Sequence, residues 1–271
     1  MEDPAGTYTI KASGADIWRG ADEFHFAYKE VASSACSIIA KVESLEAINN
    51  DSKAGIMIRD SLEPDAVNVA LLFTPDPEKG LRFQYRNATG SGTVRGDRDL
   101  DPNAMPPYWV KLERTYPGGL IRAYRSPDGE EDTWTRFDLK TTSMPMPIYI
   151  GLAVTSHDVT QVCEAKFSNV SFPGNDTLAS QAWAHCDIGI ISNESEPMYV
   201  AINGKAVYNE DPNAVLIGQW TKWQIPLQKF SDSGVDLSRA NSFSIGLGNK
   251  DNPQPGGQGI IYIDDIRLYV P

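Results

Sequence analysis

Polar and aromatic side chains recur through the first two thirds of the chain, at intervals that strands could bring to one surface. Aromatic rings cover the apolar C–H faces of a sugar, and planar polar groups hydrogen-bond its hydroxyls. The residues of these types that we select as a candidate site are Trp18, His25, Arg59, Gln84, Tyr85, Arg86, Trp134 and His157. Their chemistry predicts a carbohydrate-binding surface.

The segments that carry these residues alternate between apolar and polar positions, which is the period of a β-strand. In residues 23–29, Phe24, Phe26 and Tyr28 fall on one side and His25, Ala27 and Lys29 on the other. Residues 55–59 and 81–86 divide in the same way, with Arg59, Gln84 and Arg86 on the polar side. We expect one side of each strand to pack and the other to meet ligand or water.

Glycine and proline punctuate the whole chain of 271 residues, with 22 glycines and 18 prolines. Turn clusters such as residues 74–77, 126–129 and 252–257 recur at strand-like intervals, so regular helices should be rare. Residues 236–240 read as a single helical turn. A Pro-Gly turn at residues 173–174 marks the expected boundary between two units, residues 1–172 and residues 173–271.

The formal charge of −12 argues against a nucleic-acid partner, which requires a concentrated basic stripe. No apolar run reaches membrane-spanning length, so we expect no membrane partner. Cys36, Cys163 and Cys186 lack a metal-ligand spacing and allow at most one disulfide. Buried free thiols are the preferred interpretation.

Five motifs follow one another along the first unit: residues 15–18 (ADIW), 22–29 (DEFHFAYK), 53–59 (KAGIMIR), 107–114 (PYWVKLER) and 149–157 (YIGLAVTSH). Through their order and spacing, the first unit resembles the DUF1349 group of concanavalin A-like sandwich domains. The resemblance implies a two-sheet jelly roll of the kind appended to secreted bacterial proteins that act on polysaccharide. A secreted or cell-surface location, and a catalytic domain in a longer parent chain, are expectations of the same origin.

The second unit is expected to be a small jelly-roll-like β unit, with strands in residues 198–202, 220–227, 242–247 and 260–266. It resembles the C-terminal part of carbohydrate-binding jelly-roll modules, through residues 220–223 (WTKW) and 262–269. An aspartate in the closing strand of such modules often holds structural Ca²⁺. On a strand, Asp264 would share a face with Ile266 and Leu268, so its carboxylate would point inward and need a partner. We therefore take Asp264 and Asp265 as candidate calcium ligands.

Each candidate residue also has a purely structural interpretation. Arg59 could pair with Glu43 or Glu23 across a sheet instead of meeting a ligand. His25 and His157 could be sheet histidines satisfied by nearby acids. Tryptophans in a sandwich are often core residues.

Hydrolysis of glycosides is an alternative function, and it requires two facing carboxyl groups about 5 to 9 Å apart. Glu43 and Glu46 are spaced to fall on opposite faces of a strand, and residues 130–132 (EED) fall in a turn. No nucleophile elbow, phosphate loop or zinc motif is present. We therefore predict an all-β protein that binds polysaccharide without catalysis, with a glycoside hydrolase or a structural adhesion scaffold as alternatives.

Overall fold

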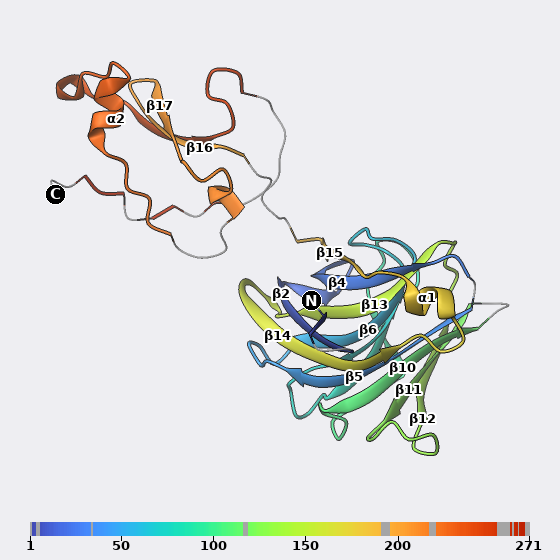
Figure 1. Cartoon of the computed structure of the whole chain (residues 1–271). Coiled ribbons are helices and arrows are strands. Elements are labelled where there is room, and N and C mark those ends of the chain that lie inside the picture. Colours follow the sequence, from blue (N-terminus) through green and yellow to red (C-terminus); the bar gives the residue numbers. More distant parts are fainter. Residues whose placement is uncertain are drawn as a thin grey trace. The chain divides into compact units, whose positions relative to one another are not determined.

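The computed structural model divides the chain into two compact units, Met1–Ile190 and Ile191–Pro271. It describes residues 2–3, 6–33, 35–115, 119–190, 196–216, 221–253, 261, 263–264 and 266–268, without the side chains of residues 2, 3, 98 and 99. The first unit is an antiparallel β-sandwich of two sheets (Figure 1). The all-β fold class predicted from the sequence is confirmed.

One sheet of the sandwich has seven strands in the order β1-β2-β14-β5-β10-β11-β12. Their bounds are β1 Glu2–Asp3, β2 Thr7–Gly14, β5 Cys36–Leu45, β10 Tyr108–Thr115, β11 Leu120–Ser126, β12 Thr135–Thr141 and β14 Asp158–Ser171. β5 lies near the middle, between β14 and β10, and its apolar residues face the second sheet.

The other sheet has eight strands, in the order β15-β4-β13-β6-β7-β8-β9 with β3 paired to β4. Their bounds are β3 Asp16–Trp18, β4 Ala21–Val31, β6 Lys53–Arg59, β7 Asn68–Phe73, β8 Leu81–Arg86, β9 Val94–Asp101, β13 Ile148–Thr155 and β15 Ala184–Ile188. This sheet carries the candidate functional site.

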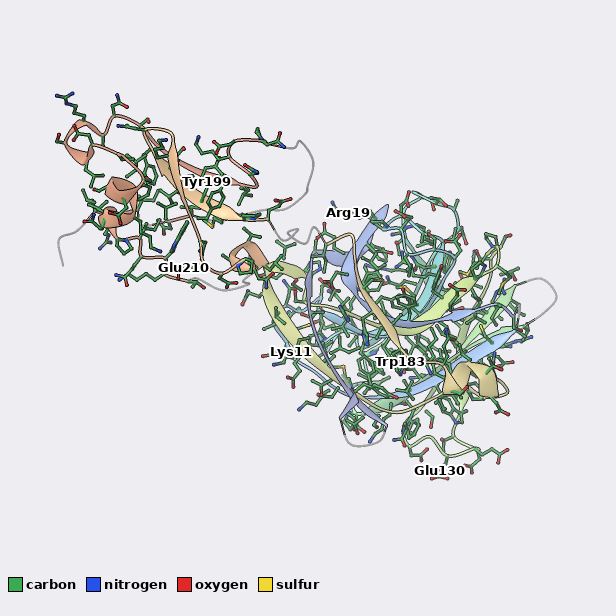
Figure 2. The ribbon with its side chains drawn as sticks, turned by 45° about the horizontal axis from the view of Figure 1, so that its top comes forward. Lys11, Arg19, Glu130, Trp183, Tyr199 and Glu210 are labelled. Atoms are coloured by element: carbon green, nitrogen blue, oxygen red, sulfur yellow. The ribbon has the colours of Figure 1, made fainter. Side chains whose placement is uncertain are left out.

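Side chains fill the space between the two sheets (Figure 2). The main core contains Ile56 and Ile58 of β6, together with residues of β5, β7, β8, β10 and β13. A second apolar cluster lies on the opposite, outer face of the eight-stranded sheet, where Met57 of β6 packs with Phe24, Phe26 and Leu72. The central strands are therefore buried on both faces, as the long apolar run of β7 requires.

The alternation predicted for β4 is confirmed, and its aromatic side packs as predicted, but the other side is also packed instead of meeting ligand or water. Phe24 and Phe26 belong to the outer cluster, whereas Ala27 belongs to the core between the sheets. The physical reason is that the outer face is itself covered, so it can hold the larger aromatic residues. Sequence alternation separates the two rows of a strand without showing what lies over each row.

The first unit ends later than the predicted boundary after residue 172. β15 pairs with β4 along five residues and extends the eight-stranded sheet. Before it, the short helix α1 (Asp176–Ser180) buries Leu178 in the main core. Residues 173–190 thus complete the sandwich, and the second unit starts at Ile191.

The second unit contains an antiparallel three-stranded sheet in the order β17-β16-β18. Its elements are β16 Met198–Ile202, β17 Lys205–Tyr208, η1 Ala214–Leu216, α2 Leu227–Asp232, η2 Leu237–Arg239 and β18 Phe243–Leu247. The predicted strands at residues 198–202 and 242–247 and the single turn at 236–240 are confirmed.

Two predicted strands of the second unit are wrong over the residues that the structure describes. Residues 221–226 have no regular structure and lead into α2, and residues 261, 263, 264 and 266–268 form no strand. The unit has a small core of Val200, Phe230 and Val235. None of the described helices, in either unit, is long and apolar enough to cross a membrane.

Candidate functional site

The outer face of the eight-stranded sheet is covered by the β3–β4 hairpin. β3 pairs with β4 through the two-residue loop Arg19–Gly20, in the register Trp18↔Ala21. Ile17 is fully buried in the outer cluster, and its carbonyl accepts a hydrogen bond of 2.6 Å from Gln84 Nε2. The hairpin therefore covers side chains that the sequence pattern alone assigns to an open surface.

A buried ionic group fixes this cover in place. Asp22 accepts two hydrogen bonds from Arg86, at 2.5 and 3.0 Å, and its Oδ2 lies 3.8 Å from Arg59 Nη1. All three side chains are fully buried. Asn68 donates a further hydrogen bond to Asp22 at 3.2 Å. Such a geometry stabilises only when the remaining donors are also satisfied.

Backbone carbonyls of the covering loops satisfy those donors. Arg59 donates to the carbonyls of Ser61 and Glu63. Arg86 donates to the carbonyls of Arg19, Pro64, Ala66 and Ser91. Burial lowers the pKa of Arg59 to about 10, with Asp22 acting in the opposite direction, so the guanidinium stays charged at neutral pH.

The sugar-binding role predicted for Arg59, Gln84 and Arg86 is therefore not supported by their positions. They are buried beneath the hairpin, where they hold it and the neighbouring loops. Arg59 is paired, as the structural interpretation required, but with Asp22 rather than Glu43 or Glu23. Glu43 instead contacts Lys41 and Ser168.

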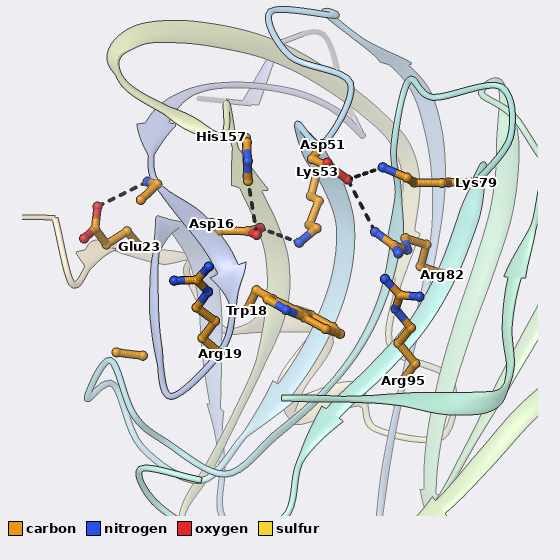
Figure 3. Close-up of a pocket in the computed structure, with 12 residues that line it drawn as sticks. Asp16, Trp18, Arg19, Glu23, Asp51, Lys53, Lys79, Arg82, Arg95 and His157 are labelled. Carbon is orange, nitrogen blue, oxygen red and sulfur yellow. Dashed lines mark hydrogen bonds and ion pairs between the residues drawn. The ribbon is translucent and has the colours of Figure 1, made fainter. Parts of the chain in front are cut away.

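A pocket of about 440 Å³ opens beside the hairpin (Figure 3). Its lining residues come from β3, β4, β6, β8 and β9 and from five connecting segments: Ala15, Asp16, Trp18, Arg19, Ala21, Glu23, Asp51, Lys53, Lys79, Arg82, Arg95 and His157. Two residues of the predicted site, Trp18 and His157, meet here. The volume lies within the range typical of small-molecule sites.

Lys53 lies deep in the pocket and is almost completely buried. Its ammonium forms an ion pair with Asp16 and donates to the carbonyl of Ile17 at 3.2 Å. Burial lowers the pKa of Lys53, and the charge of Asp16 opposes that shift. The second oxygen of Asp16 lies 3.4 Å from His157 Nδ1, although the two atoms do not form a hydrogen bond.

A second ion-pair group forms the opposite wall. Asp51 Oδ1 lies 2.8 Å from Lys79 Nζ and 3.5 Å from Arg82 Nη1. Burial favours a higher pKa for Asp51, but the hydrogen bond from Lys79 and the nearby positive charges outweigh it and lower the pKa. The same hydrogen bond raises the pKa of Lys79. Asp51 is therefore ionised and suited to hold cations, not to act as a general acid.

Two cations lie near the ring of Trp18. Lys53 Nζ is 5.6 Å from the centre of its ring, and Arg95 Cζ is 5.5 Å away. Both distances allow cation–π attraction. Figure 3 shows Lys53 above Trp18, and Arg82 and Arg95 to its right.

Two pocket residues have a backbone conformation that favours glycine. In the described part of the chain, the non-glycine residues with positive φ are Arg19 at 57°, His157 at 59°, Asn169 and Asn203. Asparagine adopts this region readily, whereas arginine does so at a cost. Strained residues of this kind cluster at functional sites, which favours the pocket as a site.

The other predicted site residues lie elsewhere. His25 pairs with Asp187 of β15 at 2.8 Å and stacks against His185. Tyr85 packs against the main core, with Lys140 over its ring. Trp134 precedes β12 and donates to the carbonyl of Gly129 at 3.3 Å. Glu130 lies at the outer end of that loop (Figure 2), as predicted for a solvated turn.

The structure describes only one of the two candidate calcium ligands. Asp264 is exposed rather than inward, and Asp265 lies outside the described residues. The described ranges of the chain contain no group of three or more His, Cys, Asp or Glu residues that could hold a metal ion. The calcium site remains a prediction.

The sequence analysis missed most of the charged residues of the pocket. Lys53 could have been found as a lysine at the start of an apolar strand, because such a group needs a buried partner. Asp16, Asp51, Lys79 and Arg95 carry no such signal, since their meeting depends on how the hairpin and the loops fold over the sheet.

Comparisons with known proteins give no family. No family model and no curated protein matches the sequence. Similar solved structures include a functionally unknown protein from Saccharomyces cerevisiae, at 19% identity and a TM-score of 0.45, covering 63% of this chain and 89% of that one. The resemblance to the DUF1349 group therefore stays a prediction.

Two lectins are also similar in structure. Basic winged bean lectin with Tn-antigen is 12% identical with a TM-score of 0.33, covering 62% of this chain and all of that one. A lectin from Bauhinia forficata in complex with GalNAc is 10% identical with a TM-score of 0.35, covering 64% and 93%. These likenesses carry no argument about the ligand of this chain, which has to be inferred from the pocket.

Proposed function

We propose that the first unit binds a saccharide in the pocket beside the β3–β4 hairpin. The observation that carries this proposal is the combination of an aromatic ring, several planar or multivalent hydrogen-bond donors and carboxylate acceptors around one cavity of about 440 Å³. Vicinal hydroxyls of a sugar require hydrogen-bond donors and acceptors close together. The pocket offers donors on Arg19, Arg82 and Arg95 and acceptors on Asp16 and Glu23. The cavity is large enough for a short segment of a sugar chain.

The pocket is also held ready for a ligand. Asp16 pairs with Lys53, and Asp51 pairs with Lys79 and Arg82. Side chains that are already paired lose less freedom on binding, which favours affinity. A scaffold module would present a flat surface, whereas the surface beside the β3–β4 hairpin contains a pocket.

Hydrolysis is less well supported than binding. Asp51 is ion-paired with two cations and has a lowered pKa, whereas the acid of a glycosidase needs a raised pKa. Asp16 is likewise paired with Lys53. A secreted or cell-surface location and a polysaccharide as the natural ligand remain parts of the proposal that derive from the sequence.

The proposal is tested by titrating the full chain with a panel of short neutral and acidic oligosaccharides while tryptophan fluorescence and heat are measured. We expect at least one saccharide to bind with one site per chain and to change the emission of Trp18. The binding should weaken in Arg19→Gly, which suits a residue with positive φ and leaves the hairpin loop intact.

A reducing-sugar assay on the same samples separates binding from hydrolysis. No binding by any saccharide, or binding that Arg19→Gly leaves unchanged, would contradict a saccharide site in this pocket. Release of reducing ends that is lost in Glu23→Gln would favour the hydrolase instead.

A further inference from the structure

Two of the three histidines of the chain lie side by side at one edge of the eight-stranded sheet. His25 belongs to β4 and His185 to β15, which pair as antiparallel neighbours. Their ring centroids are 5.7 Å apart, and the ring planes are 26° from parallel. Neither residue lines the pocket of the proposed saccharide site, so this pair has no role there.

The register between β15 and β4 explains why the two rings meet. Asp187 lies opposite His25, and His185 lies opposite Ala27, so the two histidines are diagonal neighbours on one face of the sheet. Cys186, between His185 and Asp187 in the sequence, points to the other face and packs against the outer apolar cluster. Strand alternation therefore separates the thiol from two imidazoles and one carboxylate, which it brings together.

Asp187 determines which nitrogen of His25 is available to a ligand. Its Oδ1 lies 2.8 Å from His25 Nδ1. Because an ionised carboxylate only accepts, Nδ1 of the neutral ring carries the proton and Nε2 keeps its lone pair. In the part of the chain that the structure describes, no hydrogen bond reaches that Nε2 or either ring nitrogen of His185. A carboxylate behind a histidine in this way is typical of metal ligands, whose ring it orients and makes more basic.

The separation of the two rings suits a single metal ion bound by both. A histidine nitrogen binds Zn²⁺ at about 2.0 to 2.1 Å, which places the ring centroid about 3 Å from the ion, so two ligating rings have centroids up to about 6 Å apart. The observed 5.7 Å falls within this limit. The torsion that turns an imidazole is soft, so each ring can direct a nitrogen to a shared ion. His25 is partly exposed and His185 is exposed, which gives an ion access.

We propose that His25 and His185 bind a divalent transition-metal ion, Cu²⁺, Ni²⁺ or Zn²⁺, which joins β15 to β4, with Asp187 as a positioning residue. Imidazole suits these ions, whereas Ca²⁺ and Mg²⁺ take oxygen ligands. The described ranges contain no group of three or more His, Cys, Asp or Glu residues that could hold a metal ion, so water completes the coordination. The site is independent of the proposed saccharide function.

Isothermal titration of the metal-free full chain with CuCl₂, NiCl₂ and ZnCl₂, in a buffer that does not bind metals, tests the site. We expect one ion per chain, with Cu²⁺ bound more tightly than Ni²⁺ or Zn²⁺. His25→Gln and His185→Gln should each weaken Cu²⁺ binding about tenfold or more, because each removes one of two nitrogen ligands. Asp187→Asn should weaken it by about tenfold but keep two nitrogen ligands in the electron paramagnetic resonance spectrum.

His157→Asn is the matched control, since it removes the remaining histidine of the chain. His157 has a φ of 59°, which asparagine adopts readily, so the variant should fold and bind the metal as the native chain does. Nuclear magnetic resonance of the native chain gives a test that needs no variant. Zn²⁺ should shift the ring signals of His25 and His185 together and leave those of His157 in place.

Zn²⁺ should also raise the unfolding temperature of the native chain and not that of the double variant His25→Gln/His185→Gln, because an ion bound only by the folded state stabilises it. Equal affinity of the native chain and the two histidine variants would overturn the site. A Zn²⁺ shift at His157 instead of the other two rings would do the same. Binding to both rings without a rise in unfolding temperature would overturn the joining of β15 to β4.

Discussion

Asp22 is the residue on which the covering of the outer sheet face depends most. It is the buried carboxylate between Arg59 and Arg86, and all three side chains are fully buried. Removal of one partner from such a group leaves an uncompensated charge in the interior. Its place in the sequence gave no sign of this role, because its partners are distant along the chain and on other strands.

Asp22→Ala should lower the free energy of unfolding by about 3 to 5 kcal/mol, because two guanidinium groups lose their counter-charge. Urea denaturation followed by circular dichroism measures the change. Asp22→Asn, which keeps the shape but not the charge, should also be destabilising. Asp97→Ala, at an exposed position of β9, serves as the control and should change stability by less than about 0.5 kcal/mol. An Asp22→Ala loss no larger than that of the control would show that the backbone carbonyls alone satisfy both arginines.

Asp51 gives the pocket a defined response to acid. Its pKa is lower in the folded protein than its ordinary value of 3.8, because Lys79 and the neighbouring cations outweigh burial. A carboxyl group of this kind contributes stability above its unfolded pKa and loses it as the pH falls through the folded pKa.

Asp51→Asn should therefore be less stable than the native chain at neutral pH, by about 0.5 kcal/mol, since a third of Asp51 is exposed and its ion pairs are screened by water. The difference should shrink as the pH falls below 3.8. Denaturant titrations over a pH series measure it. A difference that stays constant through the acid range would mean that Asp51 acts through packing and not through its charge.

At the scale of the elements, the strands of the sandwich could be predicted and their covering could not. The alternation of Ile56 and Ile58 with Met57 and Arg59 correctly separates the two faces of β6. It does not show that β3 folds back over the outer face, since a three-residue strand has almost no periodicity. For that reason Arg59 and Arg86 were assigned to a ligand, although they bind the hairpin and its neighbouring loops.

The three free cysteines differ in burial according to the position of their strands in the sandwich. Cys36 of β5 and Cys163 of β14 are buried in the main core, and burial raises the pKa of each thiol to about 11. Cys186 lies on the edge strand β15 and is only partly buried, although burial raises its pKa as well. All three are unpaired, as the sequence analysis preferred.

We expect Cys186 to react first and slowly with a thiol reagent in the native protein, because an edge strand opens more easily than a central one. Cys36 and Cys163 should react only at the rate of unfolding of the sandwich, since a buried neutral thiol is a poor nucleophile. Mass spectrometry of peptides after timed labelling assigns each site. Labelling of Cys163 before Cys186 would contradict the order of stability proposed for these strands.

At the scale of the whole molecule, the number of units was predictable but the boundary was not. The Pro-Gly turn at residues 173–174 is a real turn, yet the chain continues from it into α1 and β15, which belong to the sandwich. The short helix α1 and the edge strand β15 contain too few apolar residues for the sequence to predict which unit they belong to. The second unit was harder to predict, because its few strands alternate with irregular segments.

The segment after residue 172 should contribute directly to the stability of the first unit. Lys29 is buried, and its ammonium donates to the carbonyls of Leu178 and Ala179 at 2.9 and 3.0 Å. It also lies 5.0 Å from the ring of Trp183, which packs against Tyr8 and Phe172. Without residues 173–190, Lys29 would lose these two carbonyl acceptors and β4 would become an exposed sheet edge.

A chain of residues 1–190 should therefore unfold in one cooperative transition, whereas a chain of residues 1–172 should be less stable by about 2 to 4 kcal/mol. The shorter chain should also aggregate more readily, since the unpaired edge of β4 can bind another chain. Urea denaturation and size-exclusion chromatography of the two chains measure these effects, and Lys29→Met in the shorter chain should recover part of the loss by removing the buried charge. Equal stability of the two chains would show that β15 is only attached to the sandwich, and would favour a boundary at residue 172.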